Sequence, residues 1–354
     1  MVTAAVTAGE TMVGRTRLRV PAVVLVGLAL AVSILLCVIV GAADIAPSEV
    51  FRSVLHHLGL GPALDAQPLT PLRDAIVWDL RIPRVLTAGA VGAGLAICGV
   101  VMQAVTRNPL ADPYLLGLSS GASLGAVAVL LLGVPLLLPI AAFGGAGLAL
   151  AAALALAAWG GSAASPGRTV LAGVAVSQAC AALVSLVVFW SASADSYREI
   201  LSWLLGSVAG ATWTSVWLTV GAVATLGLGL ALSGNLLDGF GFGDEAAAAL
   251  GIRVERTRLL LLVGTAMLTG ALVSQSGAIG FIGLVVPHAV RLVAGQSHRL
   301  VLPLSGAAGA LVLMWADTIA RSAFAPRELP VGVVTAVLGA PIFAILLRRT
   351  RSAA

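Results

Sequence analysis

This chain of 354 residues contains no lysine, so all 20 of its basic residues are arginine. A phosphate-binding loop of the Gly-x-x-x-x-Gly-Lys type is therefore excluded, because its lysine reaches the β and γ phosphates of a nucleotide. If ATP drives this protein, another chain binds the ATP. Charged residues make up only 10% of the chain, and the arginines are not gathered into one soluble basic face, which argues against a nucleic-acid partner.

Cysteine and histidine are also scarce, which bears on metal and redox chemistry. Cys37, Cys98 and Cys180 all fall inside apolar runs, without the spacing of a redox or zinc motif. His56 and His57 are adjacent, so they do not place two ligands on one helical face. No nucleophile with a partner base stands out. We therefore expect no metal site, no catalytic residue, no enzyme activity and no cofactor bound by this chain.

Apolar residues dominate the chain: 59% are hydrophobic, 41 are glycine and the mean hydropathy is +1.06. This composition is typical of a membrane protein, because roughly 20 apolar residues are needed for each helix that crosses the hydrocarbon layer. We expect an all-α fold with ten spans, the first of them retained rather than cleaved as a signal peptide. The predicted spans are 20–42, 82–106, 114–134, 137–160, 168–191, 212–233, 257–275, 279–295, 301–321 and 331–348.

The distribution of arginine predicts the orientation of these spans. With both termini in the cytoplasm, 13 of the 20 arginines lie on the inner side and seven on the outer side. This bias agrees with the positive-inside rule, and the opposite orientation violates it. We therefore predict a multi-pass protein of the bacterial cytoplasmic membrane. Its parts are a tail at 1–19, one transmembrane domain at 20–348 and a second tail at 349–354.

Several spans contain helix-breaking residues, as in "NPLADP" (108–113) and "GFIGLVVPH" (280–288). Interrupted helices at membrane depth are tolerated where they line a cavity or pack on protein, which suggests a translocation path. In the fifth span, Ser177, Gln178 and Ser185 share one broad helical face and are candidates to line such a path. Hydrogen bonds between helices explain these three residues about as well.

The densest charge lies in "GDEAAAALGIRVERTR" (243–258), between two apolar runs. Asp244 and Glu245 precede an alanine run of high helix propensity, and acids stabilise a helix N-terminus. Gly251 fits a helix stop, and arginines follow where the chain re-enters the membrane. The pattern predicts a short helix, a turn and a basic re-entry. Either this loop is a solvated connector, or it docks into a cytoplasmic partner such as an ATPase.

Longer motifs resemble a known family. They are "RIPRVLTAGAVGAGLAICGVVMQAVTRNPLADPYLLGLSSGASLGA" (81–126), "LGI" (250–252), "GAIGFIGLVVPHAVRLVAGQSHRLVLP" (277–303), "ADTIAR" (316–321) and "ELPVGVVTAVLGAPIF" (328–343). In this order they closely resemble the FecCD-type permeases, the membrane subunits of bacterial ABC importers for ferric siderophores, haem and cobalamin. The resemblance covers nearly the whole chain from the first span onward.

This resemblance implies a set of partners and site residues. The partners are a second permease copy or a paralogue, two cytoplasmic ABC ATPase subunits that bind ATP and Mg²⁺, and an extracytoplasmic substrate-binding protein. The loop 235–256 would be the coupling element seated on the ATPase, through Asp244, Glu245, Ala249, Leu250, Gly251, Ile252 and Arg253. Arg81, Arg84 and Arg321 would dock the binding protein, with snorkelling to lipid head groups as the alternative. Asn108, Pro109, Pro166 and Gly167 would form the inner gate.

We therefore expect an ABC importer permease with a ferric siderophore as cargo, and with haem or cobalamin as alternatives. A transporter driven by an ion gradient is the competing class, but it requires an ion site or a buried carboxylate inside the membrane. The best acidic candidate, Asp317, lies near an outer helix end, four residues before Arg321. A local ion pair explains Asp317 better than a proton relay does.

Overall fold

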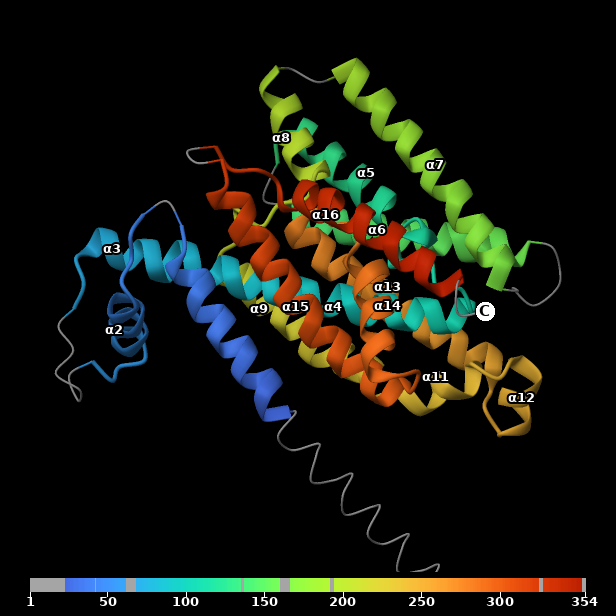
Figure 1. The fold of residues 1–354 in the computed structure, drawn as a ribbon. Coiled ribbons are helices and arrows are strands. Elements are labelled where there is room, and N and C mark those ends of the chain that lie inside the picture. The colour runs from blue at the N-terminus through green and yellow to red at the C-terminus, as the bar shows by residue number, and fades with distance from the viewer. Residues whose placement is uncertain are drawn as a thin grey trace, which may run out of the picture.

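The computed structural model describes residues 23–41, 43–61, 68–134, 137–159, 166–191, 194–324 and 327–351. Every regular element in these ranges is a helix, which confirms the predicted all-α class (Figure 1). The predicted tail at residues 1–19 lies outside the described part of the chain.

The long helices follow one another in the order that the apolar runs predict. They are Val23–Ile39, α4 (Ile82–Thr106), α5 (Leu118–Leu131), α6 (Leu138–Ala158), α7 (Pro166–Ser191), the continuous segment Trp213–Leu232 with α9 (Trp213–Ala222) and α10 (Leu228–Leu232) at its two ends, α13 (Val254–Ser276), α14 (Ile282–Ala294), α15 (His298–Ser322) and α16 (Val331–Arg351). Six helical segments in the described residues are long and apolar enough to cross a membrane. Shorter apolar helices lie at the other four predicted positions, so the count of ten spans stays a prediction.

Helix α4 is the centre of the fold (Figure 1). It continues a helix that begins earlier, at α3 (Pro71–Ala75), and widens into the π-helical segment η2 (Ile76–Arg81) before α4 starts. Its largest packing partner is α15, and α9, α13 and α14 surround the rest of it. In the most apolar 18 residues of Pro71–Thr106, 89% of the residues are buried inside the chain.

Glycine allows this close packing around α4. A Cβ atom on Gly92 would collide with the backbone carbonyl of Gly309 in α15, and one on Gly99 would collide with the carbonyl of Gly283 in α14. Helices in lipid gain little from the hydrophobic effect when they associate, so contacts between backbones at small residues supply the packing energy instead. The Gly- and Ala-rich runs of the sequence thus place α4, α14 and α15 at close distance.

Helices α5, α6 and α7 form a second group that packs on itself and joins the centre mainly through α13. Helix α7 is the most peripheral of the three, because only 17% of its apolar window is buried. Its exposed side chains include Leu171, Leu186, Phe189 and Trp190. The η3 turn (Pro113–Leu116), which follows α4, packs directly against α7.

Four short helices lie at the ends of the long ones. The sequence analysis did not predict α2 (Pro47–His57) or α8 (Ala194–Leu204), although both carry apolar residues at helical spacing. It did predict the helix α12 (Asp244–Ala249) and the turn after it, where Gly251 has a φ of +84°. Helix α11 (Gly234–Phe240) precedes α12. Figure 1 shows α2 and α3 at one end of α4, and α11 and α12 near the other.

Candidate functional site

Two charged clusters lie at opposite ends of α4. The arginine cluster consists of Arg81, Arg84, Arg321, Asp317 and Glu328. The Asp244 cluster consists of Arg107, Asp244 and Arg258. Because α4 has 25 residues and rises about 1.5 Å per residue, roughly 37 Å of helix separates them.

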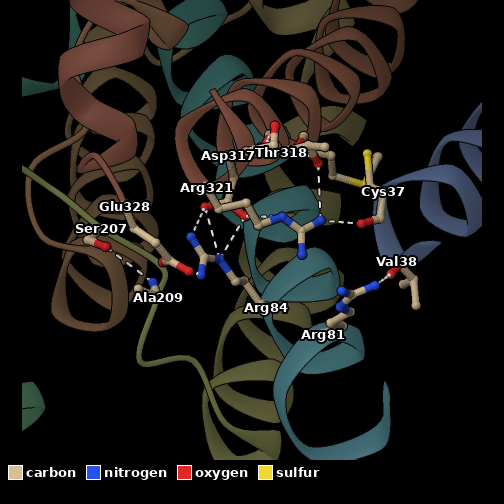
Figure 2. A network of polar contacts seen from close by, with 12 residues as sticks. Cys37, Val38, Arg81, Arg84, Ser207, Ala209, Asp317, Thr318, Arg321 and Glu328 are labelled. Carbon is tan, nitrogen blue, oxygen red and sulfur yellow. Dashed lines mark hydrogen bonds and ion pairs between the residues drawn. The ribbon is translucent and has the colours of Figure 1, made fainter. Parts of the chain in front are cut away.

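Arg84, in the first turn of α4, is the centre of the arginine cluster (Figure 2). Its Nε and Nη2 atoms donate to both carboxylate oxygens of Asp317 at 2.9–3.1 Å, and its Nη1 atom donates to Glu328 at 2.7 Å. The Arg84 and Asp317 side chains are only 9% and 2% exposed, whereas Glu328 is 48% exposed. The planar guanidinium thus joins α4, α15 and the segment before α16 by paired hydrogen bonds, the geometry in which arginine binds carboxylates most strongly.

Arg81 and Arg321 cap the end of the first long helix. Arg81 donates to the carbonyls of Val38 at 2.9 Å, Ile39 at 2.7 Å and Ala43 at 2.5 Å, and Arg321 donates to the carbonyl of Cys37 (Figure 2). The last carbonyls of a helix have no partner within it and carry partial negative charge, so cations stabilise them. These two arginines therefore attach Val23–Ile39 to α4 and α15.

These contacts change the interpretation of the three arginines. Arg81, Arg84 and Arg321 are only 6%, 8% and 6% exposed, and each donates to groups of its own chain. We assign them to holding these helix ends together. Direct docking of a binding protein stays a prediction, and it requires these side chains to exchange partners. The expected pairing of Asp317 with Arg321 is present at 4.0 Å, but Arg84 is the closer partner of Asp317.

Asp244 connects three elements at the other end of α4. It is the first residue of α12, and its Oδ1 atom accepts a hydrogen bond from Arg258 of α13 at 2.8 Å. The same oxygen lies 3.4 Å from Nη2 of Arg107, the residue that ends α4. Arg258 is 10% exposed and lies over the ring of buried Phe240, whereas Arg107 is 45% exposed. Asp244 thus bridges a buried cation and a partly exposed one.

Helix α11 is attached to the start of α15 in a similar way. The Asp238 carboxylate accepts the backbone N–H of His298 at 2.9 Å and lies 2.7 Å from the Nδ1 atom of the same residue. Arg299 donates to the side-chain oxygen of Asn235. An aspartate that accepts a backbone N–H at a helix start satisfies one of the donors left open there. The loop that carries α11 and α12 is therefore an ordered structure.

The predicted coupling residues divide into two groups by exposure. Glu245, Ala249, Leu250, Gly251 and Arg253 are exposed, and Leu250 is 68% exposed. Phe242, which the sequence analysis did not select, is 77% exposed on the same loop. Asp244 and Ile252 are partly buried, and Asp244 pairs with Arg107 and Arg258. The loop thus combines an apolar exposed surface with an internal ionic attachment.

The other predicted site residues lie on α7 and in the loop after α4. Asn108 and Pro109 follow the end of α4 directly, and Pro166 and Gly167 begin α7. On α7, Gln178 and Ser185 are exposed and Ser177 is half-buried. Ser185 donates to the Ala181 carbonyl at 2.9 Å, within its own helix, so it makes no bond between helices. Their roles in a gate and a pathway stay predictions.

The sequence analysis missed the pairings between residues that are far apart along the chain. Arg84 and Asp317 are 233 positions apart, and Asp238 and His298 are 60 apart. No local pattern signals such pairs in a single sequence. Among the described residues, no group of three or more His, Cys, Asp or Glu side chains forms a candidate metal site.

The fold is that of a polytopic α-helical membrane protein. Residues 29–349 match the FecCD transport family, and the chain belongs to that family. It is 38% identical to the uncharacterized ABC transporter permease protein YvrB of Bacillus subtilis, over 90% of this chain and 91% of the relative. It is 41% identical to the vitamin B12 import system permease protein BtuC of Salmonella typhimurium, over 78% and 85%.

Solved structures agree with this assignment. The chain superposes on an ABC transporter described as of the metal-chelate type, in an inward-facing conformation, with a TM-score of 0.81 and 27% identity. That superposition covers 93% of this chain and 99% of the other. PsaBC from Streptococcus pneumoniae shares the fold at a TM-score of 0.56 and 20% identity, over 74% and 89% of the two chains. The predicted resemblance to FecCD-type permeases is confirmed.

Proposed function

We propose that this chain is the permease subunit of an ABC importer, and that ATP hydrolysis on a separate subunit drives transport. Membership of the FecCD transport family over residues 29–349 is the observation that carries the proposal. The absence of lysine agrees with it, because the nucleotide loop has to be on another chain. The chain then supplies the path through the membrane and no catalytic residue.

The partners follow from the surfaces that the chain leaves exposed. Two ABC ATPase subunits would contact the loop at α12, where Phe242 and Leu250 are exposed beside charged residues. A second copy or a paralogue would cover α7, whose apolar side chains are mostly exposed in the single chain. A substrate-binding protein would deliver cargo at the opposite end of α4. In this arrangement α12 and both termini lie in the cytoplasm.

The cargo is a bulky metal chelate. A ferric siderophore is the first candidate, as the family resemblance predicts. Cobalamin is the second, because the chain is 41% identical to a vitamin B12 import permease. The metal-chelate type of the similar solved transporter supports the wider class. The described part of α7 carries no charged side chain between Thr169 and Ser191, which is compatible with a weakly lined path for a large cargo.

Substitution of Leu250 by arginine tests the ATPase interface. In lipid nanodiscs, the parental chain purified with a candidate ATPase from the same cell should form a stable complex that hydrolyses ATP. Leu250→Arg should lose assembly or turnover, because it places a charge in an apolar contact. Leu58→Arg adds the same charge to a 62% exposed leucine at the far end of the molecule and should keep both. The absence of any associating ATPase would reject the importer and favour an ion-gradient transporter.

A competition experiment separates the cargo candidates. Labelled ferrichrome, haem or cyanocobalamin would be added, with the binding protein, to the outside of proteoliposomes that contain the complex, each tested against the other two in excess. ATP-dependent uptake of ferrichrome alone would support the siderophore, and uptake of cyanocobalamin alone would support the second candidate.

A further inference from the structure

We infer that Arg107 is a positioning residue that transmits movement of α12 to the end of α4, through its ion pair with Asp244. The inference rests on the proposed function, in which α12 contacts an ATPase, and on the predicted inner gate at Asn108 and Pro109. It adds a specific contact between these two parts.

The backbone at Arg107 is the first observation. Arg107 ends α4 in a left-handed conformation, with φ 51° and ψ 35°, and it is one of only two non-glycine residues with positive φ in the described residues. Glycine is the usual residue at such a helix end, and other side chains adopt this conformation at a cost. The contact of its side chain with Asp244 accounts for an arginine, rather than a glycine, at this position.

The second observation is how closely α12 approaches this side chain. Asp244 Oδ1 lies 3.4 Å from Arg107 Nη2. Gly243, just before α12, has a φ of +98°, and a Cβ atom there would lie 3.5 Å from Arg107 Nη1. The start of α12 and the Arg107 guanidinium are therefore in contact range, so a shift of α12 displaces one against the other.

The third observation is that hydrogen bonds join the loop after Arg107 to the end of α4. The Asn108 N–H donates to the Gln103 carbonyl at 3.1 Å, inside the last turn of α4. The Asn108 side chain accepts the N–H of Leu110 at 2.9 Å, and the Asn108 carbonyl accepts the N–H of Ala111 at 3.0 Å. Asn108 thus bonds both to the last turn of α4 and to the residues that follow it, as asparagine often does in turns. Displacement of Arg107 would therefore carry Asn108 and Pro109 with it.

The two partners of Asp244 differ in a way that suits this role. Arg258 is 10% exposed and holds Asp244 at 2.8 Å, so it fixes the carboxylate to α13. Arg107 is 45% exposed at a longer distance, and an exposed pair exchanges with water at little cost. Asp244 can thus keep Arg258 while it makes or releases Arg107.

Arg107→Asn is the test variant, because asparagine tolerates the left-handed conformation and removes only the cation. Arg107→Lys keeps the cation. Arg52→Gln is the control, because it removes a cation from α2, at the other end of the molecule. Movement of the loop after Arg107 is followed by labelling of a thiol introduced by Leu110→Cys, because Leu110 is 44% exposed in this loop. Cys180 is partly exposed, so Cys180→Ser removes its thiol from the labelling reaction in this reporter chain. Cys37 and Cys98 are buried.

Two quantities are measured on the complex with its ATPase in nanodiscs: ATP hydrolysis, and the rate at which maleimide labels the thiol introduced by Leu110→Cys, with and without ATP and vanadate. The reporter chain should change its labelling rate about fivefold or more on ATP binding, the scale of a typical coupling between sites. Arg107→Asn should lose most of this response while ATP hydrolysis continues. Arg107→Lys and Arg52→Gln should keep it.

Several outcomes would overturn the inference. These are an unchanged labelling response in Arg107→Asn, a reporter chain that hydrolyses ATP without any labelling response, and loss of ATPase assembly in Arg107→Asn. The last would make Arg107 part of the docking surface itself. If the reporter chain binds no ATPase at all, the proposed function fails first, and the Leu250→Arg experiment shows this independently.

Discussion

The two ends of α4 use the same chemistry with different burial. At one end, Arg84 and Asp317 form paired hydrogen bonds at 2.9–3.1 Å with less than 10% of either side chain exposed. At the other end, Arg107 and Asp244 are 45% and 37% exposed and lie 3.4 Å apart. A buried pair is costly to break, because each separated charge stays out of water. An exposed pair separates into solvent, so it suits an end that changes partners.

This comparison gives each end a distinct task. The arginine cluster attaches the first long helix, α4, α15 and the segment before α16 to one another. It therefore fixes the relative positions of helices that are far apart in the sequence. The Asp244 cluster attaches a short surface helix to the ends of two long ones. Four variants or conditions test this difference.

Loss of the Asp317 carboxylate should have the largest effect. Asp317→Asn leaves Arg84 and Arg321 without their buried anion, which should lower the free energy of unfolding by about 3–5 kcal/mol. Thermal unfolding in nanodiscs, followed by tryptophan fluorescence, measures it. Glu328→Gln is the control, since this partner is 48% exposed and should cost about 0–1 kcal/mol. Equal effects of the two variants would contradict the assigned difference in burial.

Arg81→Met should have a smaller and more local effect. It removes the donor to the carbonyls of Val38, Ile39 and Ala43, at a cost of about 1.5–3 kcal/mol for bonds to a charged group. Amide exchange in the last turn of Val23–Ile39 should speed up by about tenfold or more, and α15 should change little. Arg52→Met, which removes an exposed bond inside α2, should leave that turn unchanged. An equal increase in exchange along the whole of Val23–Ile39 would show that Arg81 does not cap its last turn.

Salt should distinguish the two ends without a mutation. Raising the salt concentration from about 0.1 M to about 1 M shortens the screening length from about 10 Å to about 3 Å. The Arg107–Asp244 pair should weaken by a few tenths of a kcal/mol, and α12 should exchange its amides faster. Exchange around Arg84 and Asp317 should change little, because at most 9% of either side chain is exposed. A larger response at the arginine cluster would reverse the comparison.

The smallest effect concerns pH at α2, next to the arginine cluster. The Ala46 backbone N–H, followed by Arg73, lowers the pKa of Glu49 below its ordinary value. The stabilisation is present above the ordinary pKa of glutamate, about 4.3, and is lost as the pH falls through the lower folded value. The unfolding midpoint should therefore fall less on acidification in Glu49→Gln than in the parent. Parallel pH profiles for the two proteins would show that the Glu49 carboxylate does not contribute to stability.

The sequence predicted the all-α class and the short helix at Asp244, and it did not predict the partners of the charged side chains. Apolar runs of about 20 residues predicted the long helices, since the thickness of a membrane sets this length. Asp244, the alanines and Gly251 predicted a short helix and its stop, because local propensity controls them. The same reasoning treated Asp244 as a surface contact, and it gave Asp317 only its neighbour Arg321 as a partner. The closest partner of each aspartate is an arginine on another helix.

Family, membrane class and the absence of a nucleotide loop are properties of the sequence itself, because they depend on residue types and their order. The burial of Arg81, Arg84 and Arg321, and the bridge from Asp244 to Arg107 and Arg258, were decided only by the tertiary structure. The physical reason is that an ion pair depends on distance and desolvation. For Arg84 and Asp317, packing of α4 on α15 through Gly92 and Gly309 sets both, between segments more than 200 positions apart.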